Sequence, residues 1–225
     1  MSASGPALLF DLDGTLVDSV YQHVLAWREA LEALDIELAV WRIHRRIGMS
    51  GGLLVHALLH ETGRSVTAEE AAELQRVHTA AYLRQAGQVR PLPGACELLR
   101  HLRRIGVPFA IATSGRLDSA GPALALLGAD AATPIITRDR VQHAKPDPDL
   151  FLAAAEQLGV AITSCWVVGD SVWDLLAAQR ARALGIGVLS GGYGRDELVQ
   201  AGAYRVYDDP ADLLHHLDEV GVRLA

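Results

Sequence analysis

Two aspartates near the start of the chain, Asp11 and Asp13, stand one residue apart directly after the apolar run 7–10. Apolar residues bounded by turn signals are typical of a buried parallel strand, and side chains at i and i+2 of a strand point the same way. Both carboxylates would then face the region beyond the carboxyl end of the strand, where open α/β sheets bind ligands. Close carboxylates repel each other unless one is protonated or a cation lies between them, and Mg²⁺ suits such a site. The sequence Asp-Leu-Asp-Gly is also an ordinary strand-end turn, so the rest of the chain decides between the two interpretations.

Later apolar segments also end in polar residues, and a lysine precedes the start of another predicted helix. The residues in these positions are Thr113, Ser114, Lys145, Asp170 and Asp174. The carboxyl ends of parallel strands meet at one edge of a sheet, so we expect these side chains to gather with the aspartate pair. A phosphate group needs hydroxyl and N–H donors, a cation and metal neutralisation. The set offers all of them and predicts a phosphate site.

Each of these residues also has a purely structural interpretation. Thr113 and Ser114 could cap the next helix. Ser171 and Asp174 fit an N-cap and N3 pair, and Lys145 could be a solvated loop residue. The occurrence of all seven candidate residues in order at predicted strand ends favours phosphate chemistry.

The elements that must position these residues alternate along the chain. Apolar runs predict strands at 8–10, 107–112, 134–136, 165–168, 186–189 and 204–207. Helical patterns lie between them at 96–104, 117–127, 147–158 and 171–183, with a last helix from about residue 210. In the third of these helices Asp147 and Pro148 suit the N-cap and the first helical position. Such alternation predicts an α/β fold, a doubly wound parallel sheet of Rossmann-like type with helices on both faces.

One long segment does not follow this alternation. Residues from about 17 to 88 show three or four helices and no strand, and Thr67 with Glu70 forms a capping box that opens the last of them. The residues Pro91–Gly94 act as the linker back to the sheet. The predicted division is therefore a core formed by 1–16 and 89–225, with an inserted helical domain at 17–88.

Composition narrows the function further. The 225 residues are 50% hydrophobic and carry a net charge of -7, which provides a core and argues against a nucleic-acid partner. The sequence contains no run of about 18 apolar residues, so no membrane span is expected, and the first six residues lack the features of a signal peptide. Cys96 and Cys165 stand far apart in apolar surroundings, which predicts buried reduced thiols and a cytoplasmic protein. The oligomeric state is open between a monomer and a homodimer.

Four stretches of the chain resemble the four motifs of the haloacid dehalogenase superfamily of phosphohydrolases. They are Asp11–Ser19, Ala112–Gly115, Lys145–Pro148 and Gly169–Asp174. The resemblance covers nearly the whole chain, and the helical segment 17–88 sits where this family inserts its cap domain. The subgroup it resembles contains phosphoglycolate phosphatases and β-phosphoglucomutase.

The resemblance implies a role for each motif position. Asp11 would be the nucleophile that forms an aspartyl-phosphate, and Asp13 would be the general acid and then the base for water. Mg²⁺ would bind the Asp11 carboxylate, the backbone carbonyl of Asp13, and Asp170.

The remaining motif residues would hold the phosphate. Thr113 and the backbone N–H of Ser114 would bind its oxygens, and Lys145 would neutralise charge on the nucleophile and the phosphoryl group. Asp174 would orient Lys145 or a metal-bound water.

Within the family, Asp13 and the following glycine argue for phosphoryl transfer, because members that attack carbon lack this second aspartate. Two departures count against a sugar-phosphate mutase. The fourth motif has Gly169-Asp170 where mutases tend to show Glu-Asp, and the cap loop 48–52 lacks the arginine that the mutase uses for the distal phosphate. The expected function is a Mg²⁺-dependent phosphatase acting on a small phosphorylated metabolite that resembles phosphoglycolate or a sugar phosphate. The alternatives are a β-phosphoglucomutase-like mutase and a non-catalytic binding or regulatory protein.

The cap would choose the substrate. Its candidate contacts are His23 in the first cap helix, Arg46 in a basic turn, and Ser50 in a glycine-rich loop. Each also has a structural interpretation: a packed or surface histidine, a solvated arginine, and a simple turn between helices.

Overall fold

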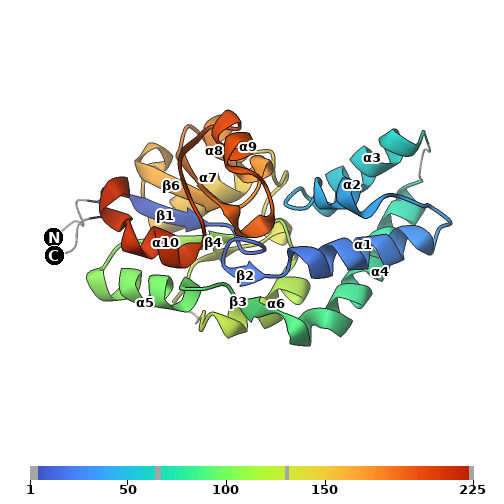
Figure 1. The fold of residues 1–225 in the computed structure, drawn as a ribbon, viewed down its shortest axis with the longest axis horizontal. Coiled ribbons are helices and arrows are strands. Elements are labelled where there is room, and N and C mark those ends of the chain that lie inside the picture. Colours follow the sequence, from blue (N-terminus) through green and yellow to red (C-terminus); the bar gives the residue numbers. More distant parts are fainter. Residues whose placement is uncertain (1–4, 64–66, 130–131, 223–225) are drawn as a thin grey trace.

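The computed structural model describes residues 5–63, 67–129 and 132–222. Six strands form one parallel sheet in the order β5-β4-β1-β6-β7-β8, which lies at the centre of the larger lobe in Figure 1. The strands are β1 (Ala7–Phe10), β4 (Phe109–Ala112), β5 (Ile135–Ile136), β6 (Cys165–Gly169), β7 (Leu184–Val188) and β8 (Ala203–Tyr207). The predicted parallel sheet is confirmed.

Helices cover both faces of the sheet. They are α5 (Ala95–Ile105), α6 (Leu117–Leu126), α7 (Asp149–Leu158), α8 (Val172–Ala181), α9 (Arg195–Gln200) and α10 (Pro210–His215). All four residues of β1 are buried, and successive side chains enter opposite layers because of the two-residue period of a strand. Leu8 and Phe10 pack with α5 and α6, whereas Leu9 packs with α7 and α8. The doubly wound α/β architecture follows from this packing.

The smaller lobe is the helical insertion. It consists of α1 (Val20–Glu32), α2 (Val40–His44), α3 (Gly51–Thr62) and α4 (Ala68–Gln85), drawn in blue to green in Figure 1. The predicted capping box opens α4: Glu70 N donates to the Thr67 hydroxyl at 3.1 Å, and Thr67 N donates to the Glu70 carboxylate at 2.8 Å. We call this helical lobe the cap from here on.

The chain leaves and re-enters the core through a short antiparallel ladder. Strand β2 (Val17–Asp18) pairs with β3 (Arg90–Pro91), and Figure 1 shows the two side by side at the base of the cap. The prediction of no strand in 17–88 was therefore wrong at its first two residues. A two-residue strand has no periodicity to detect, and its partner lies more than seventy residues further on. The division between core and cap stays a prediction in its exact boundaries.

Two local predictions were also wrong. The helix predicted to begin after Asp147 has Pro148 as its N-cap and starts at Asp149. Cys165 is buried as expected, but Cys96 is only partly buried, and both thiols are free. None of the helices in the described ranges has the length and apolar character to cross a membrane.

Candidate active site

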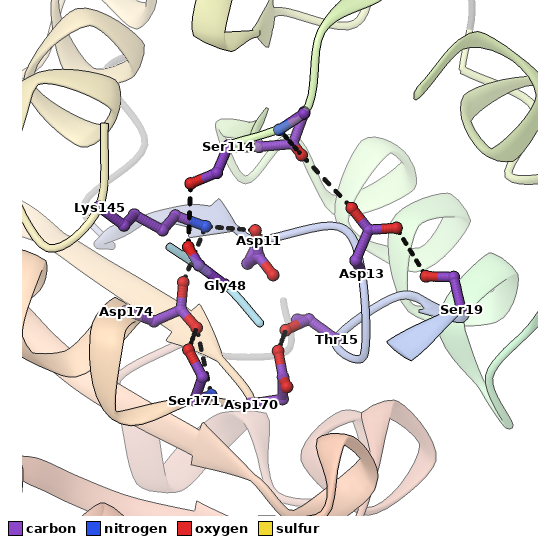
Figure 2. A network of polar contacts seen from close by, with 12 residues as sticks. Asp11, Asp13, Thr15, Ser19, Gly48, Ser114, Lys145, Asp170, Ser171 and Asp174 are labelled. Carbon is purple, nitrogen blue, oxygen red and sulfur yellow. Dashed lines mark hydrogen bonds and ion pairs between the residues drawn. The ribbon is translucent and has the colours of Figure 1, made fainter. Parts of the chain in front are cut away.

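The carboxyl ends of three adjacent strands bring the predicted site together. Asp11 follows β1, Thr113 follows β4 and Asp170 follows β6. Backbone bonds continue the ladder just beyond the strands: Asp11 N donates to Val168 O at 2.9 Å, and Thr113 N donates to Ile136 O at 2.9 Å. Figure 2 shows the resulting cluster of acidic, basic and hydroxyl side chains.

Lys145 lies at the centre of this cluster and is fully buried. Its ammonium donates to Asp11 and forms an ion pair with Asp174 Oδ1 at 2.7 Å (Figure 2). Burial alone would lower the pKa of Lys145, but the two carboxylates outweigh it and the pKa is raised. The structure places a charged lysine beside the predicted nucleophile, and the alternative of a solvated loop lysine is wrong because Lys145 is buried.

Asp174 serves two partners. Its Oδ2 accepts from Ser171 N at 3.1 Å and from the Ser171 hydroxyl at 2.5 Å, which forms the predicted capping box of α8. Its other oxygen meets Lys145. Asp174 therefore caps a helix and contacts the lysine with the same side chain, and its role in orienting Lys145 stays a prediction.

Three buried carboxylates form a candidate metal centre. Oxygens of Asp11, Asp170 and Asp174 all lie within 4.8 Å of one another. Burial and the charge of neighbouring carboxylates raise the pKa of Asp11 to about 7, against the opposing effect of Lys145, and raise that of Asp170 well above its usual value. The cluster thus holds more negative charge than the Lys145 ammonium neutralises.

The backbone around Asp170 leaves little room for anything but this carboxylate. Thr15 Oγ1 donates to Asp170 Oδ1 at 3.0 Å. A side-chain carbon placed on Gly14 or Gly191 would come within 2.6 Å or 1.7 Å of Asp170 Oδ2. Two glycines therefore let the main chain close around an acid group that a cation would stabilise.

Asp13 points away from the lysine and toward the cap. Ser19 Oγ donates to its Oδ1 at 2.6 Å, and His23 Nε2 lies 3.2 Å from the same oxygen (Figure 2 shows the Ser19 contact). Burial would raise the pKa of Asp13, but His23 and Ser19 outweigh it and the pKa is lowered. Because the carboxylate only accepts, the His23 Nε2 atom carries a proton.

Thr113 and Ser114 do not cap the following helix. The N-cap of α6 is Arg116, without a side-chain bond, and Leu117 N donates instead to Asp139. Thr113 Oγ1 accepts from Gly115 N at 2.9 Å and lies 3.5 Å from Asp13, and Ser114 Oγ donates to Gly48 O at 3.0 Å. The capping alternative is therefore wrong, and both residues line the cavity described next.

A cavity of about 430 Å³ lies between the core and the cap, and Asp11 and Asp13 line it. Of the three cap candidates, His23 lines it, whereas Arg46 and Ser50 are not among its lining residues in the described chain. The Arg46 guanidinium lies 5.9 Å from the ring centre of Trp173, and Ser50 N donates to Lys145 O at 3.2 Å. These two residues contact the core beside the cavity.

Sequence reasoning missed the residues that α4 contributes to this cavity. They are Gln75, His78 and Thr79, and Trp27 of α1 lies beside them. The spacing of i, i+3 and i+4 on a helix that the capping box already predicted would place the three on one face. Only the docking of α4 against α1 shows that this face turns to the substrate side.

A parallel α/β core with an aspartate pair after its first strand, a buried lysine and an acid cluster at the same edge defines a haloacid dehalogenase-type hydrolase. Residues 6–182 match the family profile of haloacid dehalogenase-like hydrolases. The chain belongs to this family, and the prediction of an enzyme in the phosphoric monoester hydrolase class is confirmed.

Several curated relatives match most of the chain. Hexitol phosphatase A of Escherichia coli strain K12 is 35% identical over 77% of this chain and 78% of its own length. A phosphoglycolate phosphatase of Rhodospirillum rubrum is 33% identical over 92% of this chain and 88% of its own length. A β-phosphoglucomutase of Bacillus subtilis is 30% identical over 82% of this chain and 84% of its own length.

Among solved structures, the crystal structure of a hydrolase from Pseudomonas syringae superposes with a TM-score of 0.94 at 55% sequence identity, covering 96% of this chain and 99% of that one. The likeness therefore extends over the cap as well as the core.

Proposed function

We propose that the chain is a Mg²⁺-dependent phosphatase that hydrolyses a small phosphorylated metabolite through an aspartyl-phosphate on Asp11. The observation that carries the proposal is the position of Asp11, which lies on the cavity, bonded to a buried Lys145 and beside two further carboxylates. The relatives that act on hexitol phosphates and phosphoglycolate by name support the substrate class.

The acid cluster fits a magnesium ion. Its donors are carboxylate oxygens, the ligand type that Mg²⁺ prefers. Burial and, after it, the neighbouring carboxylates raise the pKa values of Asp11 and Asp170, and a bound cation would favour their charged forms. Asp11, Asp170 and the backbone carbonyl of Asp13 would hold the ion, with Asp174 orienting Lys145. The ion would supply charge neutralisation for the phosphoryl oxygens and the nucleophile.

The chain's own residues then divide the reaction into two displacements. A carboxylate oxygen of Asp11 forms a bond to phosphorus while the bond to the leaving oxygen breaks, and Asp13 donates a proton to that oxygen. Water next attacks the phosphorus of the aspartyl-phosphate, Asp13 takes its proton, and Asp11 is released. Lys145 stays beside Asp11 throughout and offsets the charge that develops on the phosphoryl group.

The environment of Asp13 suits both of its steps. Its lowered pKa favours the carboxylate that the second displacement needs as a base. The first displacement needs a proton on Asp13, so Asp13 takes up a proton before it meets the leaving oxygen. His23 acts as a positioning residue, because its Nε2 atom, 3.2 Å away, holds the Asp13 carboxyl group in place.

The first prediction tests the nucleophile. Asp11→Asn should lower the hydrolysis of p-nitrophenyl phosphate with Mg²⁺ by at least about 10³-fold, because an amide cannot form the covalent intermediate. The melting temperature should fall little, since the variant removes one of several mutually repelling carboxylates. Asp196→Asn, an exposed residue at the start of α9, is the matched control and should keep the wild-type rate.

Two results would contradict this proposal. A near-normal rate in Asp11→Asn would rule out the covalent mechanism. A well-folded wild-type protein without turnover on p-nitrophenyl phosphate or a panel of phosphometabolites would instead favour the non-catalytic alternative.

The mutase alternative is favoured by one relative, the β-phosphoglucomutase that is 30% identical. Mutase activity would appear as interconversion of β-glucose 1-phosphate and glucose 6-phosphate. We expect release of inorganic phosphate from either compound instead, because the described cap residues that line the cavity include no arginine or lysine to hold a second phosphate. The two free thiols support the proposal that the enzyme works in the reducing cytoplasm.

A further inference from the structure

The cavity is larger than the smallest substrates of this class require. Its volume is about 430 Å³, which on a scale of about 30 Å³ per water molecule corresponds to roughly fourteen water-sized groups. A phosphoryl group with a two-carbon acid would leave part of this space filled with solvent. The cavity therefore has room for a leaving group with a longer carbon chain.

Charge is distributed unevenly over the cavity wall. In the described chain, the residues that the cap contributes to the lining include neither arginine nor lysine. The two lining arginines lie on the core and already have partners: Arg116 pairs with Asp139 at 2.8 Å, and Arg138 donates to Val141 O at 2.6 Å. Charge-assisted hydrogen bonds from arginine or lysine are the strong contacts by which a site recognises a second anionic group. The described cap residues that line the cavity offer no such contact.

The cap wall offers neutral hydrogen-bonding groups instead. Gln75 has an amide donor and acceptor, and Thr79 has a hydroxyl that donates and accepts. His78 Nε2 lies 3.2 Å from His23 Nδ1, so its Nδ1 atom is the ring nitrogen left for a ligand. Burial lowers the pKa of His78 well below its usual value, and the neighbouring His23 acts in the same direction. Groups that both donate and accept are the natural partners of hydroxyl groups, which do the same.

An aromatic wall stands next to these groups. The Trp27 ring stacks on His78 with ring centres 4.1 Å apart and an interplanar angle of 17°, and both line the cavity. Gln75 lies near this wall, since a carbon on Gly51 would lie 3.8 Å from the Gln75 side chain and 3.5 Å from Trp27. Apolar and aromatic walls with a few placed polar groups are what a carbon skeleton bearing hydroxyls fits.

We propose that the substrate is the phosphomonoester of an uncharged polyhydroxyl compound, a sugar or an alditol, and that Gln75 and Thr79 of α4 determine this specificity with His78 and Trp27. The inference rests on the proposed phosphatase function and narrows its substrate class. It excludes phosphoglycolate as the preferred substrate, because that leaving group carries a carboxylate and a single short carbon chain.

A comparison of substrates on the wild-type enzyme is the first test. With Mg²⁺ present, kcat/KM for sorbitol 6-phosphate or glucose 6-phosphate should exceed kcat/KM for 2-phosphoglycolate by at least about tenfold. The alditol and the aldose phosphate separate the open-chain and the ring forms of the same chemistry. p-Nitrophenyl phosphate, whose leaving group has no hydroxyls to recognise, reports the phosphatase activity itself.

Two variants test the residues. Gln75→Leu and Thr79→Val remove hydrogen-bonding groups at nearly constant size, and each should raise KM for the preferred polyhydroxyl phosphate about three- to tenfold. Their loss of kcat/KM on p-nitrophenyl phosphate should be clearly smaller, because its leaving group has no hydroxyls for these side chains to bind. Gln85→Leu makes the same change on the same helix outside the cavity lining and should leave both substrates unaffected.

The possible results of these experiments test the substrate class, the role of α4 and the phosphatase function separately. Equal or better hydrolysis of 2-phosphoglycolate, with p-nitrophenyl phosphate turned over normally, overturns the substrate class and leaves the phosphatase function in place. Equal losses on both substrates in the two variants overturn the specificity role of α4. Absence of turnover on p-nitrophenyl phosphate overturns the proposed function, and the substrate inference with it.

Discussion

At the scale of single residues, the acid cluster links the charge state of the site to the stability of the protein. The pKa of Asp11 is raised to about 7 and that of Asp170 is raised as well, by burial and by their neighbours. A raised pKa means that the folded state retains a proton that the unfolded chain loses, so this contribution to stability is present at low pH. It is lost as the pH rises through the folded-state value. The lowered pKa of Asp13 acts in the opposite sense, but only in the acidic range below about pH 4.

The second prediction follows from this decrease of stability with rising pH. Without metal, the melting temperature should fall by several degrees between about pH 5 and pH 8, and millimolar Mg²⁺ should restore more of it at the higher pH, because the ion binds the deprotonated carboxylates. Thermal unfolding measured with and without Mg²⁺ over this range checks it. Asp170→Asn should remove most of the Mg²⁺ effect. A Mg²⁺ stabilisation independent of pH would contradict the role of these carboxylates.

The third prediction concerns His23, which lies 3.2 Å from Asp13 and stacks on Tyr82 with ring centres 3.9 Å apart. His23→Asn should lower kcat for an alkyl phosphate about tenfold, because the alkoxide leaving group needs a proton from Asp13. The rate on p-nitrophenyl phosphate should change by less than about threefold, because p-nitrophenolate leaves without protonation. The exposed His56 of α3 gives the matched control, His56→Asn. Equal losses on both substrates would instead indicate a packing role.

At the scale of elements, the glycines at the two ends of α5 allow the cost of backbone strain to be distinguished from the cost of overpacking. Gly94 and Gly106 are the N-cap and C-cap residues with φ of 74° and 71°. A side-chain carbon on Gly94 would lie 2.4 Å from Cα of Ala211 in α10, whereas one on Gly106 would meet open space. The two sites share the same backbone strain and differ in packing.

The fourth prediction uses this pair. Gly106→Ala should lower the free energy of unfolding by about 1–2 kcal/mol, the cost of a left-handed conformation. Gly94→Ala should lower it by about 2–5 kcal/mol, because α10 must also move. Urea unfolding with activity as a second readout checks both. Equal losses at the two sites would show that α10 yields without cost.

The elements also show where sequence reasoning succeeds and where it stops. The aspartates and hydroxyls after β1, β4 and β6 could be assigned to one site because parallel strands share an edge, so position in the sequence determines position in space. The pairing of Val17 with Pro91 could not, because it depends on how the cap closes its own chain. The face of α4 that turns to the cavity could not be predicted either. Helical periodicity shows which residues share a face, but the packing of α4 against α1 decides which face meets the cavity.

At the scale of the whole molecule, the sequence predicts a core and a cap but not how the two pack against each other. The sequence left two interpretations open for the basic turn after α2, a substrate contact and a solvated surface. In the structure its backbone carbonyl at Arg45 accepts from Trp173 Nε1 at 3.2 Å and from the Tyr193 hydroxyl at 2.9 Å, and its guanidinium pairs with Glu197 of α9. Such a contact joins two surfaces far apart in sequence, and charge pattern alone does not select the partner.

The fifth prediction tests whether this contact holds the cap against the core. The Arg45 and Glu197 side chains are 34% and 42% exposed, so their ion pair contributes at most about 1 kcal/mol and is screened by salt. Glu197→Gln should therefore leave the melting temperature nearly unchanged, raise KM about two- to fivefold, and increase amide hydrogen exchange in residues 40–50. Glu32→Gln, which breaks the exposed pair with Arg28 inside α1, should change neither KM nor the hydrogen exchange of residues 40–50. The difference in KM between Glu197→Gln and wild type should become smaller in high salt, because salt also screens the ion pair of the wild type. A difference that persists in high salt would show that Glu197 acts through packing and not through its charge.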